Sequence, residues 1–235
     1  MAKSFTLGNG DMLVGLDQYG QVYDLYFPLV GQENQTGGDL VHKIGIYVDG
    51  SFSWFGEEGW KISPVLPSSG SCSRFQAVHE VKKVTILMED VVYNESCIFI
   101  RKFTVTNNGS AKRVIKLFIN HQFEIYESKR GDTAYYDPQR KAIIHHKGRR
   151  IFLINAMTHT VGIDDYSVGL FAIEGKEGTY KDAEDGVLEK NPIEHGFVDS
   201  VISFTLDINA GKSETVYYWI TISKFMKEAQ EMNNY

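Results

Sequence analysis

The feature that most constrains the fold of this chain is a nearly unbroken series of short strand-like segments separated by turn sequences. Asp49-Gly50 stands between the segments Lys43–Val48 and Ser51–Trp54, and an Asp-Gly pair in that position is one of the strongest hairpin signals. By contrast, only Lys224–Asn233 has apolar residues at helical spacing. The series therefore predicts an all-β protein with one short C-terminal helix.

Roughly fifteen such segments with hairpin spacing are typical of a large antiparallel two-sheet sandwich. The alternative is a β-propeller, which needs an internal repeat of about 40–50 residues, and the sequence contains no such repeat. No linker-like composition interrupts the series. We therefore expect one β-sandwich domain over residues 1–223 and a C-terminal helix over residues 224–235 that begins a linker.

The predicted helix has one apolar face, which contains Phe225, Met226 and Ala229. Ser223 stands where a residue that caps the start of a helix is expected. The apolar face should pack on the sandwich or on a partner domain.

The 235-residue chain has a formal net charge of −6 and two cysteines, Cys72 and Cys97. A negative net charge argues against nucleic-acid binding, which needs clustered Lys and Arg. Two isolated cysteines do not make a disulfide framework, so free thiols are expected. The N-terminal sequence lacks the apolar segment of a signal peptide, and no apolar run approaches the roughly 18 residues that span a membrane. We therefore expect a soluble cytoplasmic protein that binds neither nucleic acid nor membrane.

The stretch Tyr26–Trp60 contains a polar, glycine-rich loop, Gly31–Asp39, and two of the three tryptophans. Aromatic rings stack on the C–H faces of sugars, while amides and carboxylates bind the hydroxyl groups, so this stretch is a candidate sugar-binding or domain-facing rim. Its candidate contact residues are Phe27, Gln32, Glu33, Asn34, His42, Trp54 and Trp60. The alternative is that the tryptophans belong to the core, because Trp54 and Phe52 share one face of a strand. We expect the loop to be exposed and Trp54 to be largely buried.

A second candidate rim lies in the acidic stretch Asp182–Asp199. It belongs to Gly175–Gly196, the longest part of the chain without strand character, and loops of this length are usually functional or contain small elements of their own. The candidate contact residues are Asn191, Glu194, His195 and Asp199. The alternative is an ordinary acidic surface loop.

The sequence offers no catalytic constellation. Its acidic pairs, such as Glu57-Glu58 and Glu184-Asp185, are adjacent residues, and neighbours on a strand point to opposite faces. The seven histidines and two cysteines show none of the common zinc-ligand spacings. A sugar epimerase would need a carboxylate and a histidine that converge on the sugar, and the sequence alone cannot place such a pair. We therefore expect no catalytic residue, no metal and no cofactor.

Several stretches stand in the same order as in a known family. They are LGNGDMLVGLDQYGQVYDLYFPLVGQENQ, HKIGIYVDG and FSW in the first quarter, followed by Arg130–Asn155, Asp182–Phe204 and Val216–Lys224. These stretches resemble prokaryotic members of glycoside hydrolase family 15, which are glucoamylases, glucodextranases and trehalases. The resemblance implies an N-terminal β-supersandwich with a galactose-mutarotase-like architecture. In the family, a helical linker and an (α/α)6 barrel follow, and the barrel carries the two glutamates of an inverting hydrolysis.

The resemblance implies a non-catalytic N-terminal domain whose catalytic barrel lies outside this chain. Its expected partners are that barrel, in cis or in trans, and an α-glucan or oligosaccharide. Two further functions stay open, a free-standing carbohydrate-binding module and a sugar epimerase of the mutarotase type. A domain without its barrel should expose an apolar patch, through which a homodimer is also conceivable.

Overall fold

The computed structural model describes residues 5–66, 72–173 and 175–234, and these residues form three antiparallel sheets. The nine-stranded sheet contains, in spatial order, β15 (Ile193–Gly196), β11 (Asp132–Asp137), β12 (Ala142–Lys147), β13 (Arg150–Met157), β17 (Ser213–Ser223), β9 (Ile98–Asn107), β8 (Val84–Val92), β7 (Ser73–His79) and β6 (Trp60–Pro64). The five-stranded sheet contains β14 (Asp165–Leu170), β16 (Val198–Ile208), β10 (Arg113–Gln122), β4 (Ile44–Val48) and β5 (Ser51–Trp54). The three-stranded sheet contains β1 (Phe5–Gly8), β2 (Leu13–Leu16) and β3 (Val22–Tyr26).

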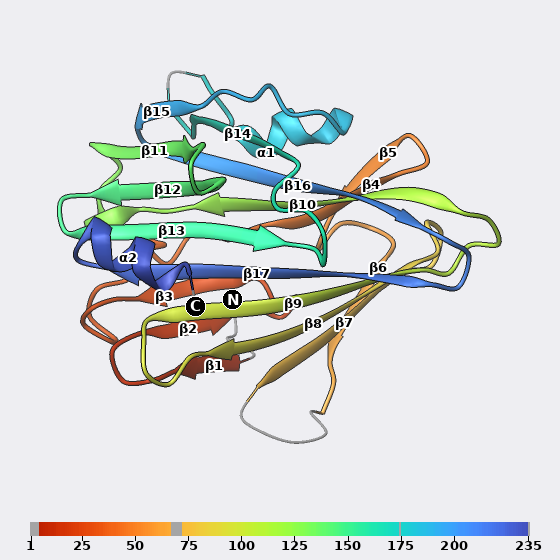
Figure 1. Cartoon of the computed structure of the whole chain (residues 1–235), viewed down its shortest axis with the longest axis horizontal. Helices are drawn as coiled ribbons and strands as arrows, with labels where there is room; N and C mark the ends of the chain where they lie inside the picture. The colour runs from red at the N-terminus through yellow and green to blue at the C-terminus, as the bar shows by residue number, and fades with distance from the viewer. Residues whose placement is uncertain (1–4, 67–71, 174, 235) are drawn as a thin grey trace.

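The nine-stranded sheet is one layer of a sandwich, and the five- and three-stranded sheets together face it (Figure 1). The main core lies between the layers and receives side chains from all three sheets, for example Leu25, Ile46 and Phe103. Alternate residues of each strand point into this core. In β10, for instance, Leu117 and Ile119 belong to the main core, whereas Phe118 points to the opposite face and packs in a second cluster.

The predicted all-β fold with a mutarotase-like sandwich and a short C-terminal helix is confirmed. The sequence indicates the β2–β3 hairpin, but β1 was not recognised as a strand, and β1–β3 form a small sheet separate from the two large ones. The four-residue strand β15 was missed as well. Both strands are too short to show a clear period of two, and each lies at the edge of its sheet.

Short helices cover part of each outer face of the sandwich. The segment α1 (Thr179–Asp182) and η2 (Ala183–Asp185) lies over the five-stranded sheet, where Ala183 packs in the cluster that contains Trp54. On the other side, α2 (Met226–Met232) lies over β13 and β17, and its Ala229 packs with Leu153. The long loop in the second half of the chain thus contains small elements of its own, as expected.

The predicted apolar face of the C-terminal helix needs one correction. Met226 and Ala229 pack on the nine-stranded sheet, but Phe225 is 51% exposed. Phe225 lies before the first helical residue, with an extended backbone of φ −132° and ψ 135°, so its side chain does not follow the helical spacing. Ser223, the predicted cap, does not cap the helix, because the helix begins at Met226 and Phe225 occupies the N-cap position; the Ser223 hydroxyl accepts a hydrogen bond of 3.1 Å from the Phe225 backbone N–H.

The loops that join β3 to β4, β10 to β11, β12 to β13 and β17 to α2 all lie at one end of the sandwich, on the left in Figure 1. The turn after β4 and the hairpins that join β9 to β10 and β16 to β17 lie at the opposite end. Cys72 and Cys97 form no disulfide. Within the described residues, none of the helices has the length and apolar character of a membrane span.

Candidate functional site

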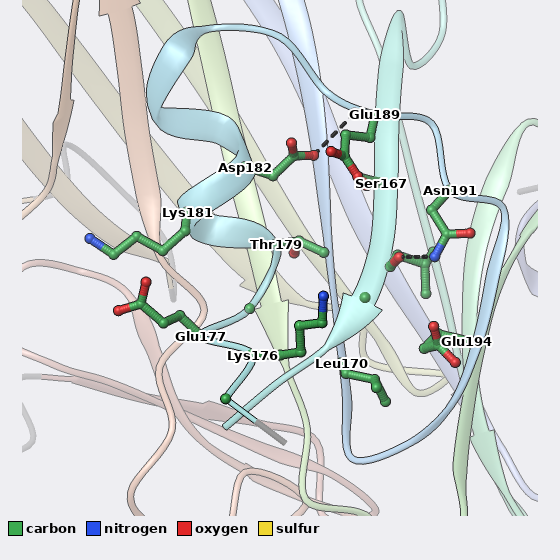
Figure 2. Close-up of a pocket in the computed structure, with 14 residues that line it drawn as sticks. Ser167, Leu170, Lys176, Glu177, Thr179, Lys181, Asp182, Glu189, Asn191 and Glu194 are labelled. Atoms are coloured by element: carbon green, nitrogen blue, oxygen red, sulfur yellow. Dashed lines mark hydrogen bonds between the residues drawn. The ribbon is translucent and has the colours of Figure 1, made fainter. Parts of the chain in front are cut away.

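A polar pocket of about 330 Å³ opens between β14, α1 and the chain that leads into β15 (Figure 2). It contains two residues of the second predicted rim, Asn191 and Glu194. The Asn191 amide donates a hydrogen bond of 2.6 Å to the carbonyl of Val168 in β14, which fixes this wall of the pocket. The other polar residues that line the pocket are Ser167, Lys176, Glu177, Thr179, Lys181, Asp182 and Glu189.

Asp199 lies behind the pocket, fully buried in β16. Both of its carboxylate oxygens accept hydrogen bonds of 2.9 Å from the backbone N–H of Thr179, and Oδ2 accepts a third of 2.9 Å from Asn120. Burial raises the pKa of Asp199 to about 7, although these donors oppose the shift. Asp199 therefore ties the start of α1 to the five-stranded sheet, and its carboxyl group does not reach solvent.

Two glycines allow α1 to approach the sheet this closely. A Cβ atom on Gly169 would lie 2.8 Å from Cγ2 of Thr179, and one on Gly178 would lie 2.9 Å from Oδ2 of Asp199. Gly178 also has a φ of +124°, which L side chains rarely adopt. Below η2, the Trp54 side chain is only 4% exposed, as predicted, and packs with Phe118.

The pocket combines carboxylates and ammonium groups at its mouth. Asp182 accepts a hydrogen bond of 3.1 Å from the Glu189 backbone, and burial raises the pKa of its carboxyl group. In Figure 2 the Lys176 ammonium group points between α1 and β14. His195 lies in β15, where its Nδ1 is 2.9 Å from the Thr133 hydroxyl. The side chains of the pocket suit polar contacts to a partner or ligand. Asp199, whose pKa is raised to about 7, lies behind the pocket and is inaccessible to a substrate.

The first predicted rim is organised around an ion pair. Glu33 accepts hydrogen bonds of 2.5 and 2.8 Å from the Arg150 guanidinium group at the β12–β13 hairpin, and a third of 2.8 Å from Gln35. These hydrogen bonds lower the pKa of Glu33, with Arg150 as the larger cause. Arg150 also lies over the rings of Tyr126 and Phe27, at 4.7 and 5.9 Å.

The loop Gly31–Asp39 is less exposed than predicted. Gln32 and Gly31 are exposed, but Asn34, Gln35 and Thr36 are buried. The Asn34 side chain donates a hydrogen bond of 2.7 Å to Asp24 and accepts one of 3.1 Å from the Leu25 N–H. The middle of the loop therefore adds to the β3 edge instead of standing out in solvent.

The structure brings Phe27 together with this loop, because the Gln35 amide donates a hydrogen bond of 2.7 Å to the Phe27 carbonyl, but it does not bring the two tryptophans there. Trp54 packs on the outer face of the five-stranded sheet, and Phe27 is buried in the main core. Trp60 is half-buried at the far end of the sandwich, where its indole N–H donates a hydrogen bond of 3.0 Å to Ser53.

A histidine cluster in the core was not recognised from the sequence. The Ser200 hydroxyl lies 3.1 Å from Nδ1 of His121 and 2.8 Å from Nε2 of His145, across the two layers. The predicted contact residue His42 lies in the same cluster, with its ring 5.6 Å from that of His121. Burial lowers the pKa of His42 and of His145 to about 3. Strand periodicity could have placed His121 and Ser200 on the inner face, but not the contact between strands of different sheets.

All three of these imidazoles are buried, and they line none of the pockets described here. Among the residues that the structure describes, no group of three or more His, Cys, Asp and Glu side chains is arranged to hold a metal ion.

The fold is a large antiparallel β-sandwich, and the comparisons with known proteins show which proteins it resembles. No protein-family model matches the chain. An uncharacterized glycosyl hydrolase of Methanocaldococcus jannaschii, MJ1610, is 24% identical over 220 residues, which are 93% of this chain and 34% of that protein. The chain thus spans about a third of the length of this relative.

Among solved structures, a bacterial glucoamylase in complex with acarbose matches with a TM-score of 0.76 at 10% identity, over 100% of this chain and 34% of the glucoamylase. A putative aldose 1-epimerase of Escherichia coli K12 matches with a TM-score of 0.58 at 9% identity, over 94% of this chain and 99% of the epimerase. A putative kojibiose phosphorylase from the human microbiome matches with a TM-score of 0.57 at 11% identity, over 99% of this chain and 32% of that protein. The predicted resemblance to the N-terminal sandwich of glycoside hydrolases is thereby confirmed at the level of the fold.

Proposed function

We propose that this chain is the non-catalytic N-terminal domain of a glucoamylase-like glycoside hydrolase, and that it supports a catalytic barrel and shapes the rim of the active site. The observation that carries the proposal is the match to one third of a bacterial glucoamylase over the whole of this chain. In the same way, 93% of this chain matches 34% of the relative from Methanocaldococcus jannaschii. The family resemblance supplies the rest of the proposal, namely that the parent enzyme hydrolyses α-glucosidic bonds with inversion.

The internal chemistry of the chain supports a non-catalytic role. Asp199 has a pKa near neutrality but is fully buried. His42, His121 and His145 lie in the core between the layers. A general acid or base must come within hydrogen-bond reach of its substrate, and these groups are enclosed. Under this proposal residues 1–223 form the domain and residues 224–235 begin the linker to the barrel.

The test begins with the reading frame downstream of Tyr235 and the genes beside it. We expect a catalytic barrel to be encoded in the same frame or by a neighbouring gene, and its glucan hydrolysis to need this domain. Malto-oligosaccharides, isomaltose and trehalose should be assayed with the barrel in the presence and absence of residues 1–223. Equal activity and equal stability in both preparations would contradict a supporting role.

A sugar epimerase is the second candidate, because the aldose 1-epimerase matches over 99% of its own length. Polarimetry on freshly dissolved α-glucose separates the two functions. We expect the chain to leave the spontaneous rate of mutarotation unchanged, since the Asp199 carboxyl group and the imidazoles of His42, His121 and His145 are buried. The carbohydrate-binding alternative is tested by calorimetric titration with the same three sugars at millimolar concentration.

A further inference from the structure

The outer face of the nine-stranded sheet has a pocket of about 580 Å³ beside the C-terminal end of α2, and we call it the outer-face pocket. In Figure 1, α2 covers only one end of β13 and β17. The volume of the pocket lies within the range of about 300–1,000 Å³ that is usual for small-molecule sites. The described residues that line it are Tyr93, Ile98, Ile100, Met157, Trp219, Met232, Asn233 and Asn234.

Three neighbouring strands build the base of the outer-face pocket. Trp219 of β17 lies directly opposite Ile100 of β9 on one side and opposite Asn155 of β13 on the other. Residues opposite each other in a sheet point to the same face, so the Trp219 indole lies between an apolar side chain and an amide. Tyr93 and Met157 also line the pocket, and they are 42% and 44% exposed. An aromatic and apolar surface is therefore accessible to a ligand.

The Trp219 ring is held by the residue that follows α2. Its indole N–H donates a hydrogen bond of 3.0 Å to the side-chain oxygen of Asn233, which accepts a second one of 3.0 Å from the Asn155 amide. An indole N–H can only donate, so the oxygen of Asn233 must face Trp219 and its NH2 group is directed away. In the described part of the chain this NH2 group makes no hydrogen bond, and neither does the side chain of Asn234. Both amides are thus free to bind a ligand beside the indole.

The charge and polarity of the lining restrict the class of ligand. Of the described residues that line the outer-face pocket, none carries a charge, so a phosphate, carboxylate or ammonium group would leave water without an oppositely charged partner. A purely apolar partner would bury the amides of Asn233 and Asn234 without hydrogen bonds, which is also unfavourable. A neutral sugar meets both conditions, because its C–H faces stack on rings such as those of Tyr93 and Trp219 while its hydroxyl groups bind the amides.

We propose that the outer-face pocket binds a neutral sugar, namely a short stretch of α-glucan. The neutral sugar follows from the lining of the pocket, whereas the choice of α-glucan rests on the proposed function. A glucan chain held here stays at the enzyme without taking part in its hydrolysis. Because the contact consists of stacking and a few hydrogen bonds, we expect a Kd of about 1 mM for maltotriose.

NMR titration of the isotope-labelled chain with maltotriose tests the location of the site. The chain has three tryptophans and therefore three indole N–H signals. We expect the signal of Trp219 and the side-chain amide signals of Asn233 and Asn234 to move, with half-saturation at about 1 mM. The signals of Trp54, which is 4% exposed, and of Trp60, which contacts Ser53 at the far end of the sandwich, should stay in place. Shifts confined to another face, or no shift up to about 20 mM maltotriose, overturn the inference.

Tyr93→Ala tests the stacking contact. It should weaken the binding of maltotriose at least about fivefold, because one of the two rings is lost. Tyr217→Ala is the matched control, since Tyr217 is 36% exposed on the same face of the sheet but does not line the pocket. Wild-type affinity of Tyr93→Ala, or an equal loss in both variants, overturns the inference. Far-UV circular dichroism shows whether each variant is folded, and equal affinity for cellotriose and maltotriose overturns the choice of an α-glucan.

The intact polypeptide that the gene encodes separates this inference from the proposed function. There, Tyr93→Ala should lower the fraction of protein retained on amylose resin severalfold and leave the rate of maltotriose hydrolysis unchanged. If the variant is retained as wild type is, the pocket does not hold glucan in the whole protein, and the inference is overturned while the proposed function stands. If the wild-type polypeptide hydrolyses no α-glucan, the proposed function is contradicted instead, and the choice of α-glucan falls with it.

Discussion

Arg150 and Glu33 lie 117 positions apart in the chain, and they join two loops of the sandwich through a two-pronged ion pair of 2.5 and 2.8 Å. Both side chains are mostly buried. The pair orders the first half of the β3–β4 loop against the β12–β13 hairpin. It also holds the guanidinium group 4.7 Å from the centre of the Tyr126 ring.

Glu33→Gln should lower the free energy of unfolding by about 1–3 kcal/mol, because Arg150 would lose its charged acceptor in a mostly buried site. The Arg150 hydrogen bonds hold the pKa of Glu33 below the usual value of 4.5. The contribution is therefore present above that value and is lost as the pH falls through the folded pKa, where wild type and variant should converge. Urea unfolding between pH 7 and 3 measures both effects. Glu80→Gln, at the exposed pair with Lys61, should cost about 0.5 kcal/mol or less.

Asp199→Asn should make the stability of the domain fall more steeply as the pH is lowered. The pKa of Asp199 is raised from 3.8 to about 7 by burial, so between these values the folded chain holds a proton that the unfolded chain releases. This uptake stabilises the fold as the pH falls, and it opposes the buried histidines. His42 and His145 stay neutral in the fold but are protonated in the unfolded chain below pH 6.5.

Without the Asp199 carboxyl group, proton uptake on folding no longer offsets the destabilising effect of the buried histidines as the pH falls. The free energy of unfolding of the variant should then decrease by up to about 1.4 kcal/mol more per pH unit than that of wild type between pH 7 and 4. Urea denaturation at pH 7, 6 and 5 measures the slope. Asp207→Asn, at an exposed position, should leave the slope unchanged, and parallel profiles for Asp199→Asn and wild type would contradict the prediction.

Gly45→Ala should destabilise the five-stranded sheet. A Cβ atom at this position would lie 2.6 Å from Cε3 of Trp54 and 2.7 Å from Cε1 of Phe52, and neither ring can move freely because the cluster is buried under η2. We expect a loss of about 1–3 kcal/mol and a red shift of tryptophan fluorescence. Gly162→Ala is the control, because its nearest atom would be the Ala156 carbonyl oxygen at 3.8 Å.

Asn233→Ala should loosen the attachment of α2. The Asn233 side-chain oxygen accepts hydrogen bonds of 3.0 Å from the indole of Trp219 and of 3.0 Å from the amide of Asn155. Both donors would lose their partner, which costs about 1–2 kcal/mol in a half-buried site. Faster amide exchange in residues 226–232 measures the loosening. Asn234→Ala changes no such contact and should leave the exchange rates of α2 as they are in wild type.

The sequence predicts most of the fold because its hairpins are local. The signal at Asp49-Gly50 depends on neighbouring residues, and the strands on either side of this turn are found where they are expected. The burial of Trp54 follows in the same way from its shared strand face with Phe52. Where a strand is long enough to show an alternation of polar and apolar residues, the sequence correctly predicts which side chains point into the protein.

The candidate sites could be predicted only in part, since they depend on contacts between distant strands. Asn191 and Glu194 were predicted and do line one pocket, because they lie close together in the sequence. The Glu33–Arg150 pair and the Ser200–His145 contact join residues 117 and 55 positions apart. No local pattern encodes such pairings, so Arg150, Tyr126 and Ser200 carried no signal in the sequence that would identify them.

The last two strands of the sandwich occupy interior positions of the two large sheets. β16 lies between β10 and β14, and β17 lies between β9 and β13. While the first 197 residues are being synthesised, the strands on either side of these two gaps have no partner to close them. Until both strands emerge from the ribosome, the strands beside the two gaps expose unpaired edges, which favour aggregation. The domain is thus a unit of synthesis as well as of structure, because a chain interrupted before Val198 leaves both large sheets divided.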